Sequence, residues 1–182
     1  MNEENEMSKD FDLMKAKESL ISVDMLRNYL KYDNGVIIWV KSTSNRVKAG
    51  DEAGTVHKSG YKVFRFFGFD VKCHRVSWAL CKGEWPSKYI DHKNGIRTDN
   101  RIENLREASS SENNRNMKKP SHNTSGVKGV GFCKQTGKYT AWIWVNNKKI
   151  WLGRHTTKES AREAYLKASN YYHGEFGCDG DR

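Results

Sequence analysis

The clearest periodic pattern in the chain lies in its last third, where apolar and polar residues alternate over residues 138 to 145. Residues 127 to 132 and 148 to 153 also have the composition of strands, and turn-forming residues separate the three segments at 135 to 137 and 146 to 147. This pattern predicts a three-stranded antiparallel sheet.

A helix is predicted to follow these strands. Thr156 and Glu159 have the spacing of a capping box, and Gly174 suits a helix end. The apolar stripe of this helix consists of Ala161, Ala164, Tyr165, Ala168 and Tyr172. Because the alanines are small, the helix can lie close against the sheet. We therefore expect residues 126 to 176 to form one small domain.

Strand alternation also assigns the two faces of the middle strand. The face toward the helix takes Tyr139, Ala141, Ile143 and Val145. The opposite face takes Thr140, Trp142 and Trp144, near Trp151, Lys128, Lys134, Lys138 and Lys149. Exposed tryptophans indicate a binding surface. The lysines favour DNA, with aromatic rings packing on sugars or thymine methyl groups, and a protein partner or a dimer interface is the alternative.

The first half of the chain has a weaker and mixed pattern. Residues 1 to 20 show no clear period, so a flexible acidic tail is expected there. A short helix after Ser22, strands over 36–40 and 61–67, and a helix over 74–80 are indicated further on. Together with the later segments, these elements predict an α+β fold with a β-rich N-terminal region.

Polar residues with possible catalytic chemistry follow the second of these helices. A short apolar strand ends in Asp91 and His92, a second short segment carries Asn104, and a helix-compatible segment carries Asn113. Adjacent side chains of a regular strand point to opposite faces, so Asp91 and His92 can share a site only if the strand bends or ends there. The glycine turn after His92 favours such an end.

These residue types suit hydrolysis of a phosphodiester. Imidazole is a ready proton acceptor near neutral pH, and carboxylate and amide oxygens are hard ligands for magnesium or manganese. Hydrolysis needs a base that takes a proton from water and a cation that stabilises the departing oxygen. The alternative for the Asp-His pair is an ordinary hairpin turn whose histidine is satisfied by the backbone.

Residues 73 to 116 resemble the HNH endonucleases of the ββα-metal type, in the subgroup of phage and intron-encoded homing endonucleases. The resemblance is carried by Asp91-His92, by Asn104 at 12 positions after His92, and by Asn113 at 9 positions after Asn104. It implies that His92 is the general base, that Asp91 and Asn113 hold one Mg²⁺ or Mn²⁺ ion, and that Asn104 fixes the loop between the strands. It also implies products with 5′-phosphate and 3′-hydroxyl ends.

Residues 125 to 176 resemble the plant ethylene-response-factor (APETALA-type) DNA-binding domain. The matching residues are Lys128-Gly129-Val130, Ala141-x-Ile143, Trp151-Leu152-Gly153 and Ala161-x-x-Ala164-Tyr165-x-x-Ala168. In that family, arginines on the exposed sheet face read bases. Lys128 matches one such position, but Gly131 and Trp144 stand where arginines are usual, so sequence specificity does not carry over.

Charge and its distribution favour nucleic acid as the partner. The net charge is +10, and residues 113 to 158 hold ten Lys or Arg and no acid, whereas residues 1 to 24 hold seven acids and three lysines. Aromatic residues interleaved with the basic block favour a polyanion-binding surface over disorder. Double-stranded DNA is the predicted partner, without a membrane or an obligatory protein partner. Arg97, in the loop after His92, is the expected phosphate contact.

Cysteine usage and hydropathy exclude other classes. The four cysteines include no Cys-x-x-Cys pair, so no structural zinc is expected and the thiols should be reduced. No segment has the length and apolar character of a membrane span or a signal peptide. The expected location is the cytoplasm, that of a bacterial host if the gene is phage-borne.

The predicted organisation is therefore a sequence of five parts. They are a tail over 1–20, an HNH endonuclease domain over 21–117 with its ββα core at about 87–116, a linker over 118–125, a DNA-binding domain over 126–176 and a tail over 177–182. The predicted function is metal-dependent DNA cleavage at a site that the C-terminal domain recognises. The alternatives are a catalytically inactive DNA-binding regulator and a module that uses its tryptophans to bind protein.

Overall fold

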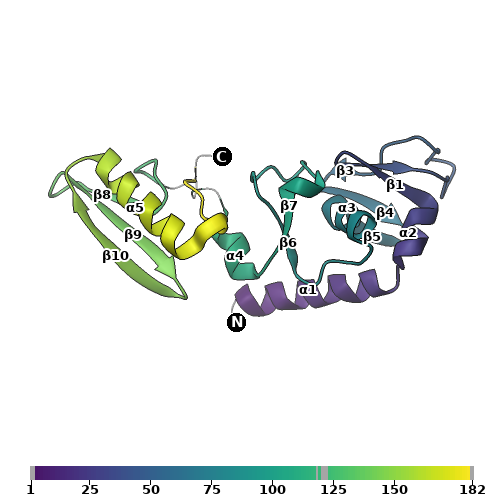
Figure 1. Cartoon of the computed structure of the whole chain (residues 1–182), viewed down its shortest axis with the longest axis horizontal. Helices are drawn as coiled ribbons and strands as arrows, with labels where there is room; N and C mark the ends of the chain where they lie inside the picture. The colour runs from purple at the N-terminus through teal and green to yellow at the C-terminus, as the bar shows by residue number, and fades with distance from the viewer. Residues whose placement is uncertain (1–2, 118, 120–122, 181–182) are drawn as a thin grey trace. The chain divides into compact units, whose positions relative to one another are not determined.

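The computed structural model of the chain describes residues 3 to 117, 119 and 123 to 180. The chain forms two compact units, Met1–Ala108 and Ser109–Arg182. Short antiparallel sheets and helices alternate along the chain, so the predicted α+β class is confirmed (Figure 1). None of the described helices is long and apolar enough to cross a membrane.

The first unit contains three helices and seven strands in its described residues. The helices are α1 (Glu3–Ser19), α2 (Val23–Tyr29) and α3 (Cys73–Lys82), and a 3-10 turn, η1, spans Ile102–Asn104. The strands are β1 (Leu30–Asp33), β2 (Val36–Trp39), β3 (Thr55–Val56), β4 (Lys62–Phe66), β5 (Phe69–Lys72), β6 (Tyr89–His92) and β7 (Leu105–Ala108). They pair as β1–β2, β3–β4–β5 and β6–β7.

Helix α3 is the centre of this unit, in contact with β1, β2, β4 and β5 (Figure 1). One of its faces buries Val76 and Ala79, and the core around it includes Leu26, Trp39 and Phe66. The Trp39 ring stacks on Phe66 with centroids 6.0 Å apart. Burial of such large rings is a main source of stability for a small core. This core fixes α3, and the chain that leaves α3 forms the β6–β7 hairpin.

The N-terminal segment differs from the flexible tail predicted for residues 1 to 20. It forms α1, and the Glu18 carboxylate on this helix makes a buried ion pair with the Arg75 guanidinium of α3. The Phe11 ring lies 4.4 Å, centroid to centroid, from the Tyr89 ring of β6. An ion pair and a single ring contact leave no apolar period in the sequence, which is why the pattern did not reveal the helix.

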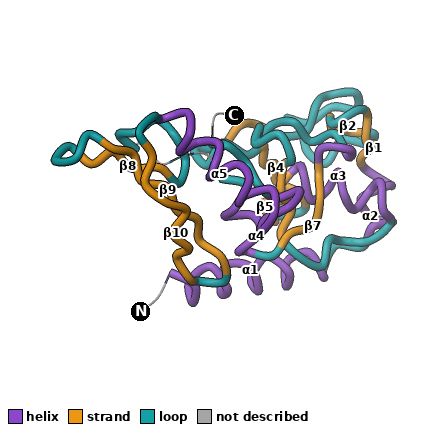
Figure 2. Tube along the Cα trace, turned by 60° about the vertical axis from the view of Figure 1, so that its left-hand side comes forward, coloured by secondary structure: helices purple, strands orange, loops and turns teal. Residues whose placement is uncertain are grey.

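In its described residues, the second unit contains the three-stranded sheet and two helices. Its elements are α4 (Ser110–Arg115), β8 (Val130–Cys133), β9 (Lys138–Val145), β10 (Lys148–His155), α5 (Lys158–His173) and a 3-10 turn, η2 (Gly174–Phe176). The strand order is β10–β9–β8, all antiparallel, and α5 lies along one face of the sheet (Figure 2). The predicted architecture of a three-stranded antiparallel sheet on one helix is confirmed.

The two sides of the middle strand β9 are also confirmed by burial. Ala141 and Ile143 are buried against α5, and Tyr139 and Val145 pack at the edge of this core. Two details of the helix differ from the prediction. Its N-cap is Thr157, whose hydroxyl accepts from the Ser160 N–H, and not Thr156. Tyr172 is exposed, and the next residue, His173, takes the buried position instead.

The boundary between the units falls before α4, earlier than the predicted domain end at residue 117. Within the second unit, the Lys128 ammonium donates to the carbonyls of Arg115 and Met117 at the end of α4, at 2.6 and 2.7 Å. The Cys178 thiol lies 3.2 Å from the Met117 carbonyl oxygen. These contacts group α4 with the residues that follow it.

The predicted linker and C-terminal tail are only partly covered by the described residues. Residues 118, 120 to 122, 181 and 182 lie outside them. Asn123 begins a hydrogen-bonded turn, in which its amide oxygen accepts from the Gly126 N–H at 2.9 Å. The predicted tail packs against α5 through an ion pair between Asp179 and Arg162 at 3.1 Å. The described residues of the predicted linker and tail therefore make hydrogen bonds and an ion pair.

Candidate active site

His92 is the last residue of β6 and is almost completely buried, with 4% of its surface exposed. Its Nε2 lies 3.1 Å from the amide oxygen of Asn100. The imidazole also meets the His74 ring edge to face at 5.2 Å and the Tyr61 ring at 5.9 Å, centroid to centroid. A strand end, a loop residue and two aromatic rings therefore hold the imidazole.

The surroundings of His92 favour its neutral form. Burial lowers the pKa of His92 below its usual range, although the hydrogen bond with Asn100 and the nearby Asp91 carboxylate both act to raise the pKa. Burial lowers the pKa of His74 much further, and His92 and Lys72 add to the effect. Near neutral pH both rings are therefore uncharged, and the imidazole of His92 is in the form that accepts a proton.

Asp91 is buried like His92 but belongs to the other side of β6. The register of the hairpin is regular, with Asp91 opposite Arg106 and His92 opposite Leu105. Arg106 Nε donates to Asp91 Oδ2 at 2.8 Å, and Nη2 lies 2.7 Å from the same oxygen. The strand ends at His92, as the glycine turn predicted, and contains no bend before it. The carboxylate and the imidazole therefore start from opposite faces of the strand.

Asn104 ties together the loop that connects the two strands of the hairpin. Its Nδ2 donates to the Asn94 amide oxygen at 3.0 Å and to the Asp99 carbonyl at 2.8 Å, and its Oδ1 accepts from the Asn94 N–H. Arg101 binds the Asp99 carboxylate through two nitrogens and lowers its pKa to about 2. Hydrogen bonds from Asn104 and the ion pair between Arg101 and Asp99 therefore hold the loop in one conformation.

Arg97 lies exposed in this loop. Its guanidinium donates to the Ser59 carbonyl at 2.7 Å and sits 5.0 Å from the centre of the Tyr61 ring. The Tyr61 ring also contacts His92. A cation is thus held close to the imidazole at the surface of the first unit, which suits contact with a phosphate.

Asn113, the other predicted metal ligand, lies on α4 in the second unit. The helix starts with a complete capping box, in which the Ser109 hydroxyl accepts from the Glu112 N–H and the Glu112 carboxylate accepts from the Ser109 N–H. This cap satisfies N–H groups at the start of the helix and so stabilises the turn that carries Asn113. That Asn113 and Asp91 bind one common cation stays a prediction.

The donor chemistry of the predicted metal site fits a hard divalent cation. Carboxylate and amide oxygens are the ligands that Mg²⁺ and Mn²⁺ prefer. The two nitrogens of Arg106 fix the orientation of the Asp91 carboxylate, as an outer-shell partner does for a ligand. No group of three or more His, Cys, Asp or Glu side chains is arranged to hold a metal within the described ranges. The predicted site, with one Asp and one Asn, has too few of these residue types to count as such a group.

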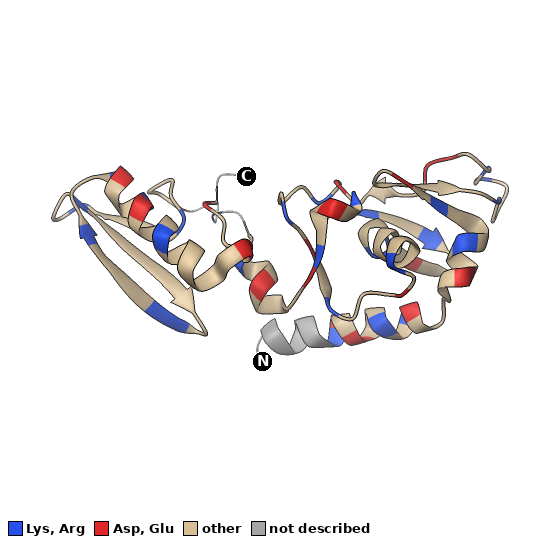
Figure 3. Ribbon diagram, in the orientation of Figure 1, with Lys and Arg blue, Asp and Glu red and all other residues tan. Residues whose placement is uncertain are grey.

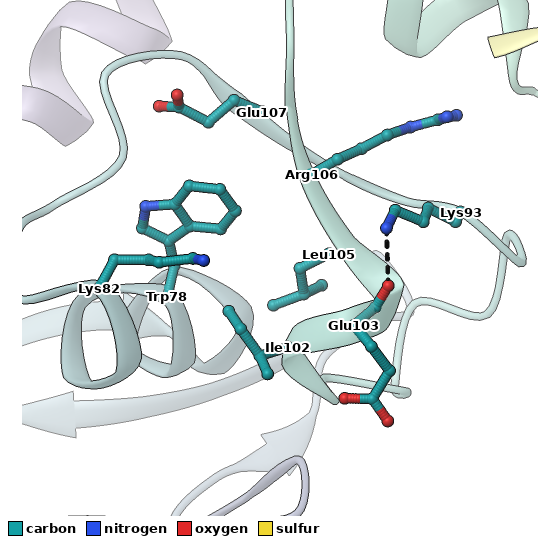
Figure 4. Close-up of a pocket in the computed structure, with 8 residues that line it drawn as sticks. All are labelled: Trp78, Lys82, Lys93, Ile102, Glu103, Leu105, Arg106 and Glu107. Carbon is teal, nitrogen blue, oxygen red and sulfur yellow. Dashed lines mark hydrogen bonds between the residues drawn. The ribbon is translucent and has the colours of Figure 1, made fainter. Parts of the chain in front are cut away.

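A shallow pocket lies between α3 and β7, apart from the His92 cluster (Figure 4). Its lining residues are Trp78, Lys82, Lys93, Ile102, Glu103, Leu105, Arg106 and Glu107. Lys82 stands beside the Trp78 ring, and Lys93 donates to the Glu103 carbonyl at 2.7 Å. Because carboxylates are mixed with the lysines, the pocket is not a uniformly basic surface and does not by itself indicate a phosphate site.

In the second unit, the sheet face away from α5 carries exposed aromatic and basic side chains. Trp144 and Trp151 are 58% and 57% exposed, and the Lys149 ammonium lies 4.2 Å from the centre of the Trp142 ring. Lys134 and Lys138 are exposed in and beside the turn between β8 and β9. Figure 3 shows Lys and Arg on these strands, whereas no Asp or Glu lies within β8, β9 or β10.

Arg154 also lies on this face, a position that was not predicted from the sequence. The register of β10 shifts between Trp151 and Gly153, so Trp151 lies opposite Trp142 and Arg154 lies opposite Thr140. Simple alternation from Trp151 would have turned Arg154 toward the helix. A β-bulge leaves no reliable mark in a single sequence, so only the structure reveals this position. Lys128 donates to the carbonyls of Arg115 and Met117 at the end of α4, and its contact with DNA stays a prediction.

Asn100 is the second residue that the sequence analysis missed. It lies between Asp99 and Arg101 in a loop rich in Asn and Asp, so its sequence context resembled an ordinary turn. Its contact with His92 depends on the fold of the whole loop.

Comparison with known proteins identifies the first region. Residues 71 to 115 match the family described as HNH endonuclease. Protein 3.8 of Escherichia phage T7 is 35% identical over 89 residues, which cover 48% of this chain and 74% of the phage protein. A search of solved structures gave no significant match. With the family match, the hairpin geometry and this coverage taken together, the chain belongs to the HNH endonuclease family.

Proposed function

We propose that the protein is a metal-dependent DNA endonuclease of the homing type, which hydrolyses phosphodiester bonds at a site recognised by its second unit. The observation that carries this proposal is the position of His92, a buried imidazole whose Nε2 lies 3.1 Å from the Asn100 amide oxygen. Burial lowers the pKa of this imidazole, which favours the neutral form. The Asp-His, Asn104 and Asn113 spacing supports the same reaction class. A neutral base beside a surface cation, Arg97, suits the attack of water on a phosphate.

In this proposal, His92 takes the proton of the attacking water, whose oxygen bonds to phosphorus while the bond to the 3′ oxygen breaks. The products carry 5′-phosphate and 3′-hydroxyl ends. Arg97 holds a phosphate oxygen of the strand that is cut. Asp91 and Asn113 bind one divalent cation, Mg²⁺ or Mn²⁺, which would stabilise the negative charge on the departing oxygen. Asn104 keeps the loop around the base in place.

The aromatic and basic face of the second unit is proposed to bind double-stranded DNA, as in the ethylene-response-factor type of domain. Lys138, Lys149 and Arg154 supply positive charge, and Trp144 and Trp151 supply flat apolar surface. Phosphate contacts make such binding depend on salt. If six to ten phosphates are neutralised, affinity falls by roughly three to five orders of magnitude between about 50 and 200 mM salt.

The first experiment is cleavage of supercoiled plasmid and phage genomic DNA by the full chain with Mg²⁺ or Mn²⁺, followed by run-off sequencing of the products. We expect cuts at defined positions, and no cutting in EDTA. DNA that remains intact with both metals, although the protein binds it, would contradict the proposal. That result would identify a DNA-binding regulator, the one alternative supported by an observation, because Arg106 already neutralises the Asp91 carboxylate.

A control distinguishes a protein-binding module from both DNA-binding candidates. A module that uses its tryptophans on a protein would have no salt-sensitive affinity for DNA. Fluorescence anisotropy with a labelled duplex at several salt concentrations measures this directly. The similarity to a protein of phage T7 supports a bacterial host as the proposed site of action.

A further inference from the structure

We propose that Asn100 is a positioning residue that selects which nitrogen of His92 acts as the base, and that the β1–β2 hairpin holds Asn100 in place. This inference rests on the proposed function and names a residue and a segment that serve the same site. The β1–β2 hairpin lies outside residues 71 to 115, the part that matches the family.

The contact between Asn100 and His92 decides the tautomer of the imidazole. The amide oxygen of Asn100 lies 3.1 Å from Nε2, and an amide oxygen can only accept a hydrogen bond. Nε2 therefore carries the hydrogen in the neutral ring. The lone pair is left on Nδ1, which becomes the atom that takes a proton from water. An amide orients the ring without placing a charge beside it.

The burial of the Asn100 side chain lowers the stability of the fold, so folding does not explain it. Only 1% of its surface is exposed, and its Nδ2 has no hydrogen-bond partner among the residues that the structure describes. A buried amide donor without a partner destabilises a fold. Within the described part of the chain, the one hydrogen bond of this side chain is to the proposed base, so its contribution lies in orienting that base.

The loop around Asn100 is held from two sides. From within the hairpin segment, Asn104 donates to the carbonyl of Asp99. From the N-terminal side, the Tyr32 hydroxyl of β1 accepts from the Ile102 N–H at 2.9 Å. Gly35, in the turn between β1 and β2, has a φ of +91°, and a Cβ there would lie 2.8 Å from the backbone nitrogen of Arg101. The turn therefore packs directly on the backbone beside Asn100.

This packing gives the N-terminal region a function in the reaction. The family match begins within β5, after β1 and β2, yet the loop that orients His92 contacts β1 and the turn that follows it. Loss of the Tyr32 contact would free the Ile102 amide and loosen the loop by one hydrogen bond. The β1–β2 hairpin is then a support of the base and not a separate binding element.

Two substitutions of similar size test the role of Asn100. Asn100→Leu removes the acceptor, whereas Asn100→Asp keeps an oxygen at the same place. We expect Asn100→Leu to lower kcat for plasmid cleavage about 10- to 100-fold, less than full loss of a general base, with DNA affinity unchanged. Asn100→Asp should recover most of the rate. Equal losses in both variants with unchanged melting temperature would overturn the inference.

Nitrogen NMR of the wild-type protein tests the tautomer independently of cleavage. At pH 8 the ¹⁵N shifts of His92, assigned by their loss in His92→Gln, should show a protonated Nε2 and an unprotonated Nδ1. A protonated Nδ1 would overturn the inference even if Asn100→Leu does not fold. If the wild-type protein has this tautomer but cuts no DNA, the proposed function fails while the positioning role stands.

The support from β1 has its own variant. Tyr32→Phe removes only the hydroxyl that accepts from Ile102, and we expect kcat to fall about 2- to 5-fold with unchanged DNA affinity, because one hydrogen bond of modest strength is lost. Tyr29→Phe, on α2 next to β1, is the matched control and should leave kcat unchanged. A Tyr32→Phe protein as fast as wild type would remove the N-terminal hairpin from the inference.

Discussion

The β6–β7 hairpin of the first unit and the β8–β10 sheet of the second unit are both antiparallel. They differ in which side chains they bury and which they expose. The hairpin buries charged and polar groups, including Asp91, His92 and Arg106, each less than a tenth exposed. The sheet leaves Trp144 and Trp151 more than half exposed. Each arrangement is unfavourable for stability alone.

This difference in burial indicates that the hairpin and the sheet have different functions. Buried polar groups with fixed partners suit a reaction, because their orientation and protonation are set before a substrate arrives. Exposed aromatic and basic side chains suit a partner that covers them on binding. Variants that act on one region should therefore change cleavage, and variants that act on the other should change affinity.

The largest expected effect is on His92. We expect His92→Ala to lower the rate of plasmid cleavage about 100- to 10,000-fold with DNA affinity retained, because the general base is removed. His57→Ala, at an exposed histidine between β3 and β4, is the matched control and should cut normally. If His92→Ala instead weakens binding and leaves the single-turnover rate unchanged, the division of work between the units is wrong.

The next largest effect concerns the buried ion pair of the first unit. Glu18 and Arg75 are 5% and 1% exposed, so Glu18→Ala leaves a buried guanidinium without its carboxylate. We expect a loss of about 3–5 kcal/mol in the free energy of unfolding of the first unit, measured by urea denaturation. Glu18→Gln keeps a hydrogen-bond acceptor and should lose less. A Glu18→Ala protein as stable as wild type would mean that α1 does not dock on α3 in solution.

The pH dependence of stability gives a third test of the buried polar cluster. Burial keeps the pKa of His74 well below 6.5, so in the unfolded state this ring takes up a proton at a higher pH than in the folded state. Stability is therefore complete above about pH 6.5 and falls as the pH drops, by up to about 2 kcal/mol at pH 5. His74→Phe should flatten this slope in urea melts between pH 7.5 and 5. If the slope is unchanged in His74→Phe, other titratable groups cause the pH dependence of stability.

On the sheet of the second unit we expect a smaller effect, and on affinity alone. Trp144→Ala should weaken binding to duplex DNA about tenfold, or ~1.4 kcal/mol, with an unchanged cleavage rate at saturating protein. Tyr171→Ala removes an aromatic ring that is even more exposed, on α5, and should have no effect. Equal effects of the two variants would mean that exposed rings in general, and not this face, contribute to binding.

The smallest expected effects distinguish Lys128 from Lys138, two lysines that were both predicted from the sequence to bind DNA. Lys128→Met removes the ammonium that caps α4, and we expect the second unit to lose about 1 kcal/mol of stability in thermal melts. Lys138→Met should leave the melting temperature unchanged and reduce the salt dependence of DNA binding by about one counterion. If Lys128→Met alters only the salt dependence, its contact is with DNA and not with α4.

Much of this protein could be predicted from residue patterns, because some structural signals are local. The alternation in β9 fixed its two faces, and the glycine after the Asp-His pair fixed the strand end. The spacing of His92, Asn104 and Asn113, which resembles that of HNH endonucleases, was enough to predict these three as site residues. The strand features depend on residues a few positions apart, a range over which backbone geometry governs side-chain direction, and the family motif has fixed steps of 12 and 9 positions.

What only the tertiary structure decided has a common physical origin, contact between residues far apart in the chain. Helix α1 depends on an ion pair from Glu18 to Arg75, the role of Lys128 depends on the end of α4, and the place of Arg154 depends on a bulge. The hold of β1 on the loop of Asn100 is of the same kind. Such contacts arise from packing and desolvation of distant groups, so they leave no period or motif in the sequence that could reveal them.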